Sequence, residues 1–193
     1  MAQTFEHVTL FTRKKLDLEE WKMTEFELNK FEIEHIFTYS IDVDAKMYIQ
    51  KLPIGSTRVT GVITGGKVWG PKISGEILPV GADWSTVHPN GIVDVDCRTM
   101  IRTDDGADIN MFYKGRIDLG SEEAAADYAN GKFPPVMGTQ PMPVLDTDDP
   151  RYDWCNRIAC FGIGRVDFTN DPIVIQYDVY RYYAMPFDTE KEE

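Results

Sequence analysis

Apolar and polar residues alternate with a period of two over most of residues 35–182. Phe37, Tyr39, Ile41 and Val43, for example, share one face of an expected strand. Successive side chains of a β-strand point to opposite faces, so this period predicts β-structure. Further strands are expected over residues 58–64, 73–78, 92–103, 107–117, 156–162 and 173–182.

Turn residues separate these expected strands. Pairs such as Asp105-Gly106 and Gly70-Pro71 are typical of tight connections between strands. A series of strands joined by glycine-rich turns, with almost no helical period, predicts an all-β barrel or sandwich in a single domain. The proline-rich stretch 133–143 shows no period and is expected to be a loop long enough to cover part of the molecule.

One segment has the pattern of a helix. Ser121 is suited to be the N-cap, and Glu122 and Glu123 would occupy the first turn. The body would run over residues 124–130, and Gly131 would end it. We therefore expect one short helix beside the strands.

Composition limits the class of partner. The chain has 193 residues, enough for one domain with a core, and its 32 acidic and 20 basic residues give a net charge of -12. A surface this acidic, without a basic stripe, argues against nucleic acid and anionic membranes as partners. Solubility alone is a sufficient reason for the charge. We expect an N-terminal extension (1–34) packed on the barrel, the barrel itself (35–185) and an acidic flexible tail (186–193).

The cellular compartment is inferred from features that the sequence lacks. The first residues lack the apolar run and cleavage site of a signal peptide, and no stretch reaches about eighteen apolar residues. Cys97, Cys155 and Cys160 form an odd set without CxxC spacing, and no N-x-S/T site is present. These features predict a cytoplasmic protein.

The expected strand 92–103 carries two different faces. One face holds Val93, Val95, Cys97, Thr99 and Ile101, and the other holds Ile92, Asp94, Asp96, Arg98, Met100 and Arg102. The polar face either meets water or lines the inside of a barrel, where ionised groups would need partners. Periodicity does not choose between these two arrangements.

Several blocks of sequence resemble the family called domain of unknown function 3237. They are G-G-K-V-W-G-P-K-I-S-G-E-I-L-P-V-G-A-D-W at 65–84, R-T-M-I-R-T-D-D-G at 98–106, P-R-Y-D-W-C-N-R at 150–157 and I-V-I-Q-Y-D-V-Y at 173–180. The resemblance covers roughly residues 35–182. It implies a closed antiparallel barrel of the lipocalin-like or allene-oxide-cyclase-like kind, and it implies no particular activity. The leader and Cys155 depart from the family pattern.

No pattern indicates a cofactor or a metal. Gly61 and Gly66-Lys67 have the spacing of a phosphate-binding loop, but Val68 stands where that motif needs Ser or Thr. His7, His35 and His88 are scattered without ligand spacing. We therefore expect neither a cofactor nor a metal site.

The candidate catalytic residues are Asp83, Tyr39 and Arg98. An Asp beside an indole in an apolar mouth would have a raised pKa, suited to general acid or base catalysis, although Asp83 could also simply cap its own turn. Tyr39 would donate a proton or be an ordinary core aromatic. An arginine inside the barrel would hold a ligand carboxylate or phenolate. The expected substrate-binding residues are Arg102, Trp84, Trp154, Asn156 and Asp94.

Three functions are compatible with these residues. The first is a cofactor-independent lyase or isomerase acting by proton transfer on a small aromatic or conjugated carboxylic acid or enone. The second is a lipocalin-like carrier that binds such a ligand without changing it. The third is an interaction module whose interior holds no cavity. Aromatic residues from Tyr177 to Tyr183 suit either a homodimer contact or barrel closure, and this choice stays open.

Overall fold

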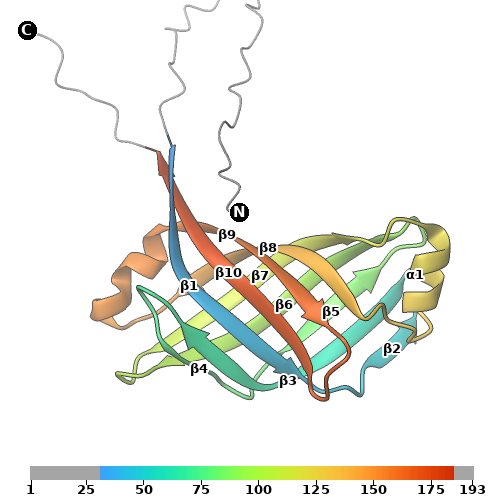
Figure 1. Ribbon diagram of the computed structural model, residues 1–193, viewed down its shortest axis with the longest axis horizontal. Helices are drawn as coiled ribbons and strands as arrows, with labels where there is room; N and C mark the ends of the chain where they lie inside the picture. The colour runs from blue at the N-terminus through green and yellow to red at the C-terminus, as the bar shows by residue number, and fades with distance from the viewer. Residues whose placement is uncertain (1–30, 185–193) are drawn as a thin grey trace, which may run out of the picture.

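The computed structural model describes residues 31–184. These residues form ten strands in one sheet, with two short helices (Figure 1). The strands are β1 (Phe31–Val43), β2 (Tyr48–Lys51), β3 (Thr57–Trp69), β4 (Gly75–Ile77), β5 (Ala82–Val87), β6 (Ile92–Thr103), β7 (Asp108–Asp118), β8 (Val136–Asp146), β9 (Ala159–Asp167) and β10 (Ile173–Ala184). The all-β prediction is confirmed.

Pairing between β1 and β3 closes the sheet. The hydrogen-bonded order is β1-β10-β9-β8-β7-β6-β4-β3-β2. Strand β5, like β4, lies between β3 and β6 and pairs with both. Because β1 also pairs with β3 from Thr38 to Val43, the strands form a closed antiparallel barrel of eight strands. Closure satisfies backbone groups that would otherwise remain unpaired at two sheet edges. The predicted closed antiparallel barrel is therefore confirmed.

The two helices lie at opposite ends of the barrel (Figure 1). Helix α1 (Glu122–Tyr128) begins as its sequence predicts, because the Ser121 hydroxyl accepts a hydrogen bond from the Ala124 amide. The 3₁₀ helix η1 (Pro150–Arg157) occupies the start of a segment expected to be a strand, and β9 begins only at Ala159. The expected strand over 156–162 is thus displaced toward the C-terminus.

The proline-rich stretch contains a strand where a loop was expected. Strand β8 pairs with β7 along Gln140–Asp146, but with β9 only along Val136–Thr139. Pro141 and Pro143 lie beyond the part that pairs with β9. A proline lacks the N–H needed between two neighbours, so it is tolerated where one edge of the strand has no partner. The prediction of a loop over 133–143 is wrong for this reason.

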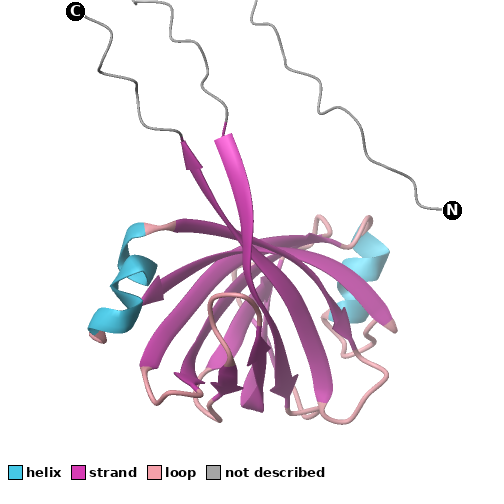
Figure 2. Cartoon of the chain, turned by 60° about the vertical axis from the view of Figure 1, so that its left-hand side comes forward, coloured by secondary structure: helices cyan, strands magenta, loops and turns pink. Residues whose placement is uncertain are grey.

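The outer ends of β1 and β10 extend past the barrel as a two-stranded ribbon (Figure 2). Phe31 pairs with Ala184 at the end of this ribbon. Residues 31–34, expected to be part of a separate extension, therefore belong to β1. The rest of the expected extension and the whole of the expected tail over 186–193 lie outside the described residues. No helix among residues 31–184 is long and apolar enough to cross a membrane.

Strand β6 turns its apolar face inward. Val93, Val95, Cys97, Thr99 and Ile101 are all buried, whereas the alternate residues from Ile92 to Arg102 are partly or fully exposed. The closed barrel has room on its inside for apolar groups packed against one another, and charged groups on the outside keep their hydration. The polar face of this strand therefore meets solvent.

Gly164 in β9 is expected to be essential to the packing of the barrel. A Cβ atom there would overlap with the Gln176 carbonyl oxygen and with the Tyr177 ring. We expect Gly164→Ala to lower the free energy of unfolding by about 1–3 kcal/mol. The control is Gly138→Ala in β8, where a Cβ would meet no atom within 4 Å. Urea unfolding should show a change of about 0.5 kcal/mol or less for this control. Equal effects of the two substitutions would contradict the assignment.

Candidate functional site inside the barrel

Asp83 occupies a position on β5 that faces the inside of the barrel. It lies opposite the buried Cys97 of β6 and opposite Gly61 of β3. One carboxylate oxygen, Oδ1, accepts a hydrogen bond from the Ser85 hydroxyl at 2.9 Å and another from the Asp96 amide at 3.4 Å. The carboxyl group is therefore held in one orientation from its own strand and from the neighbouring one.

The environment of Asp83 favours its protonated form more than water does. Loss of hydration raises the pKa of Asp83 to about 6, although the hydrogen bonds from Ser85 and from the Asp96 amide act in the opposite direction. Asp83 keeps some accessible surface, and it lines a small internal cavity. At neutral pH the group is mostly a carboxylate with a pKa close to the working pH, which suits a general base.

Three tyrosines meet in the same interior. Tyr39 of β1, Tyr113 of β7 and Tyr177 of β10 are at most 2% exposed. Their ring centroids are 5.2 Å apart for Tyr39 and Tyr177, 5.7 Å for Tyr113 and Tyr177, and 6.4 Å for Tyr39 and Tyr113. Burial raises the pKa of each phenol, so all three remain neutral O–H donors.

The hydroxyls of these tyrosines differ in their partners. The Tyr177 hydroxyl donates to Thr139 Oγ1 at 3.4 Å, whereas those of Tyr39 and Tyr113 are buried without a hydrogen-bond partner. The Tyr113 hydroxyl lies near the hydroxyls of Tyr39 and Tyr177 and near the Cys97 thiol, and it acts to lower the pKa of each against the larger effect of burial. Two phenol donors in the barrel thus have no protein acceptor among the described residues.

The carboxyl group and the tyrosines form one electrostatic unit. Cys97 lies opposite Asp83 on one side and opposite Tyr113 on the other. The charge of Asp83 raises the pKa of all three tyrosines. Burial, with the nearby Asp83 charge, also raises the pKa of the Cys97 thiol well above its usual value. This thiol stays protonated and is therefore unsuited to act as a nucleophile.

A small cavity adjoins Asp83 on the side toward α1. Its volume is about 30 Å³, and Asp83 is the one charged side chain among the described residues that line it. Tyr128, Phe133 and Phe168, which we call the aromatic plug, pack together at this end, with the rings of Phe133 and Phe168 stacked 4.8 Å apart. Such a cavity holds about one or two waters, so a larger ligand requires the plug to move.

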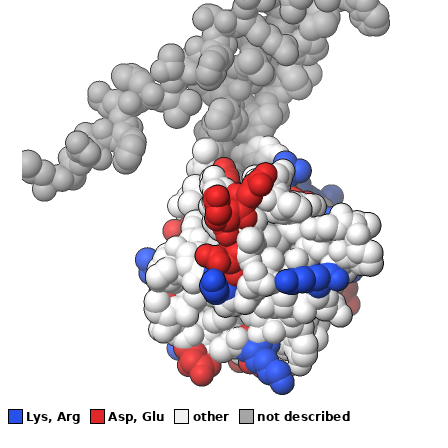
Figure 3. Space-filling model, turned by 90° about the vertical axis from the view of Figure 1, so that its right-hand side faces the viewer, with Lys and Arg blue, Asp and Glu red and all other residues white. Residues whose placement is uncertain are grey.

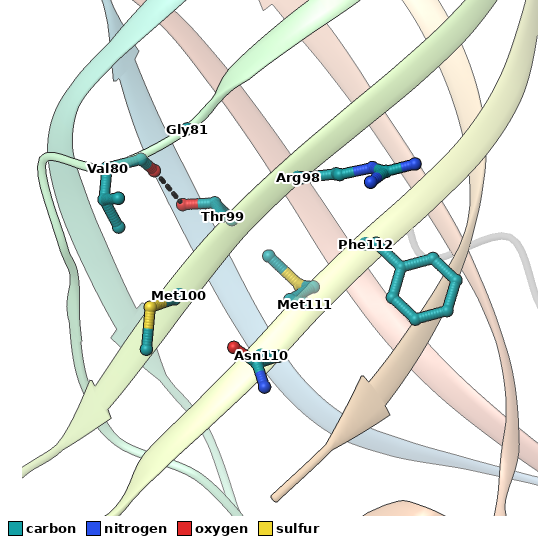
Figure 4. A pocket seen from close by; sticks show the side chains of 8 residues that line it. All are labelled: Val80, Gly81, Arg98, Thr99, Met100, Asn110, Met111 and Phe112. Carbon is teal, nitrogen blue, oxygen red and sulfur yellow. Dashed lines mark hydrogen bonds between the residues drawn. The ribbon is translucent and has the colours of Figure 1, made fainter.

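Arg98 and Arg102 lie outside the barrel, contrary to the expectation that they bind substrate within it. Arg98 points away from the interior into an open groove of about 420 Å³ on the outer face of β6 and β7, opposite Phe112 (Figure 4). Arg102 forms a two-point ion pair with Asp108, at 2.9 and 3.0 Å. Neither guanidinium reaches Asp83, because alternation along β6 places both on its solvent side.

The expected substrate-binding residues Asp94, Trp84, Trp154 and Asn156 also lie away from the interior. Asp94 pairs with His88 and Arg116 on the outer face of β6, and Trp84 is 38% exposed. Trp154 packs against the core from η1, outside the cavity lining. Asn156 hydrogen-bonds the backbone of Thr147 in both directions, which attaches η1 to the end of β8. Of the eight expected residues, the structure brings only Asp83 and Tyr39 into the interior.

Sequence reasoning missed Tyr113, Tyr177, Ser85 and Thr139. Tyr113 and Tyr177 have the same parity along their strands as buried apolar residues, so alternation contained a signal for them. Ser85 and Thr139 lie in β5 and β8, which were not expected as strands, and parity there carried no information.

Charged groups on the outside are mixed in sign. On the face that carries α1, basic side chains appear as separate patches among acidic ones, without a continuous basic band (Figure 3). Among residues 31–184, no three His, Cys, Asp or Glu side chains gather as a metal site would require. Neither the surface charge nor the distribution of these side chains points to a charged ligand for the interior site.

Comparison with known proteins places the described fold in a recognised group. Residues 31–182 match the family described as "Protein of unknown function (DUF3237)". A UPF0311 protein from Clostridium acetobutylicum is 31% identical over 129 residues, which cover 66% of this chain and 81% of that protein. The crystal structure of a β-barrel-like protein from Acinetobacter baumannii has a TM-score of 0.67 and 27% identity, covering 82% of this chain and 100% of that one.

One similar protein has a name that states an activity. A protein from Penicillium herquei named "Hydroalkoxylation enzyme phnH" is 25% identical over 130 residues, covering 67% of this chain and 72% of that protein.

Asp83 is expected to make stability depend on pH. Its pKa is raised from 3.8 to about 6, so the folded state holds its proton more tightly than the unfolded chain does. Its contribution is therefore present below about pH 4 and is lost as pH rises to about 6, by roughly 3 kcal/mol.

The measurement is urea unfolding of the parent and of Asp83→Asn from about pH 4 to pH 8. The difference in unfolding free energy should move in favour of the variant as pH rises through this range, and then stay constant. A difference independent of pH would show that Asp83 ionises as it does in water.

Proposed function

Because this chain belongs to the family described as "Protein of unknown function (DUF3237)", we propose its function from its own interior: it is a proton-transfer enzyme, a lyase or isomerase acting on a small conjugated molecule inside the barrel. The observation that carries this proposal is the Asp83 carboxyl group, held by Ser85 and the Asp96 amide and enclosed with three neutral tyrosines. A base and several O–H donors in one enclosed space are the parts that proton transfer requires.

The proposed reaction begins with the carboxylate form of Asp83. Asp83 accepts a proton from a carbon or hydroxyl of the substrate, and the electron pair moves through the conjugated system to an oxygen. A phenol O–H donates a hydrogen bond to this oxygen and stabilises its negative charge. Asp83, now neutral, returns the proton at another position. No atom is gained or lost in a double-bond migration of this kind.

The relative named a hydroalkoxylation enzyme supports the same type of chemistry. Hydroalkoxylation in general adds an alcohol O–H across a carbon–carbon double bond. Such a reaction requires one proton to be removed from oxygen and one to be delivered to carbon, which a single carboxyl group can do in turn. Similarity to this protein thus favours a catalytic barrel over a passive one.

Access to Asp83 requires a movement at the α1 end of the barrel. The cavity of about 30 Å³ is too small for an aromatic substrate, and Tyr128 and Phe168 of the aromatic plug line it. The plug connects to the strands through α1 and through the loops at residues 129–135 and 168–172. These connections are peripheral to the hydrogen-bonded barrel, so the plug can move while the strands that hold Asp83 stay paired.

Proton transfer is testable before the natural substrate is identified. Conjugated ketones and phenolic enones are incubated with the protein in deuterium oxide, and deuterium incorporation at carbon is followed by NMR. We expect exchange with at least one compound, faster as pH rises through about 6, and a loss of about 100-fold or more in Asp83→Asn. The matched control is Asp94→Asn on the outer face, which should exchange within about twofold of the parent.

Two results would overturn the proposal. The first is saturable binding in the barrel without exchange for any compound that binds, which would support a carrier. The second is exchange that Asp83→Asn and Asp94→Asn retain equally, which would place the base elsewhere.

A further inference from the structure

We propose that the hydroxyls of Tyr39 and Tyr113 form a donor pair for one oxygen of the substrate. The site then selects a conjugated ketone, enone or phenol, whose oxygen enters uncharged, and rejects a carboxylate. This inference rests on the proposed function, since it assigns a substrate class to the same interior. It also changes the expected substrate, because carboxylic acids were included only with arginines inside the barrel.

The first support is the state of the two hydroxyls. Both are fully enclosed, and neither makes a hydrogen bond of good geometry with the described residues. A buried donor without an acceptor costs stability, so native proteins seldom keep one without a reason. Two such donors in one cluster indicate a preorganised site for an acceptor that the polypeptide does not supply.

The second support is the way the cluster is built. Tyr39, Tyr113 and Tyr177 come from three strands, β1, β7 and β10. Their rings pack against one another, with centroids 5.2 to 6.4 Å apart. Thr139 engages the hydroxyl of Tyr177 and leaves the other two free. Gly164 lies against the Tyr177 ring, where a side chain would displace it. The donors are thus positioned by the rigid part of the barrel.

The third support is the absence of a counter-charge. No Lys, Arg or His among the described residues is buried, and Asp83 is the charged group that lines the cavity. Within the described part of the chain, Arg58 of β3 is the one cation whose charge acts on Asp83; it is only partly buried, and this is the last of the causes that set the Asp83 pKa. A carboxylate ligand would therefore place a second negative charge near Asp83 with no buried cation to offset it, which is unfavourable at low dielectric. A neutral carbonyl avoids this cost.

When the ligand enters uncharged, the enclosed site carries only one negative charge, and proton transfer merely moves it. Before the reaction the negative charge is on Asp83. After proton transfer Asp83 is neutral, and the charge is on the substrate oxygen, where two O–H groups can donate to it. The site therefore holds one negative charge throughout, and the donor pair strengthens its hydrogen bonds only as the charge arrives.

Binding of two probes of similar size tests the selectivity. The probes are 4-nitrophenol, whose ionisation is visible in its absorption spectrum, and 4-nitrobenzoate, a permanent anion near neutral pH. We expect 4-nitrophenol to bind at least about tenfold more tightly, in a complex that carries one negative charge. Tyr39→Phe and Tyr113→Phe should each weaken 4-nitrophenol binding by roughly tenfold.

The matched control is Tyr182→Phe, because Tyr182 is 49% exposed on β10 and lies outside the cluster. It should bind the probe as the parent does. Stability supplies a second readout: removing a hydroxyl that has no partner should leave the unfolding midpoint unchanged or raise it. Lower midpoints in both Phe variants, with unchanged probe binding, would show that the hydroxyls serve the fold and would overturn the donor pair.

The remaining outcomes separate this inference from the proposed function. Deuterium exchange that depends on Asp83 but is unchanged in both Phe variants would refute the donor pair and leave proton transfer intact. Probe binding that depends on both tyrosines, without exchange on any compound that binds, would refute proton transfer and leave the donor pair as a binding site. Equal or tighter binding of 4-nitrobenzoate would refute the selectivity.

Discussion

Pairing of β1 with both β10 and β3 closes the sheet, and the rest of the molecule depends on this closure. In a closed barrel each side chain either packs inside or meets water, since strands alternate with a period of two. A polar group on the inner face has little contact with solvent and needs a hydrogen-bond partner within a narrow space. Asp83 finds Ser85 and a backbone amide, whereas Tyr39 and Tyr113 find no partner among the described residues.

This arrangement separates two kinds of charged group in the protein. Ion pairs such as Arg102 with Asp108 lie on the outer face, where both groups stay hydrated and the pair contributes little to the free energy of unfolding. Asp83 lies among aromatic and aliphatic side chains, where loss of hydration raises the pKa of the same kind of carboxyl group to about 6. The functional candidates are therefore the few polar groups that alternation has placed inside, and the many charged groups outside bear on solubility.

The fold was largely predictable because its signals are local. Alternation identified most strands, and Ser121 marked the start of the helix, which ends at Tyr128, two residues before the expected end. The closed barrel was implied by the resemblance of the blocks at 65–84 and 98–106 to a known family. The failures also have local causes. Pro141 and Pro143 in β8 suggest a loop to any rule based on central strands, and they are tolerated because part of that strand lacks its second neighbour.

The sequence by itself determined the β-period, the turns and the identity of Asp83 and Tyr39 as candidates. It did not determine which face of residues 92–103 lies inside, because a two-residue period is symmetric with respect to the two faces. Closure of the barrel decided that question, and with it the exclusion of Arg98 and Arg102 from the interior. Only the tertiary structure brought Tyr113 and Tyr177 beside Tyr39, because contacts among three strands distant along the chain depend on the register of the whole sheet.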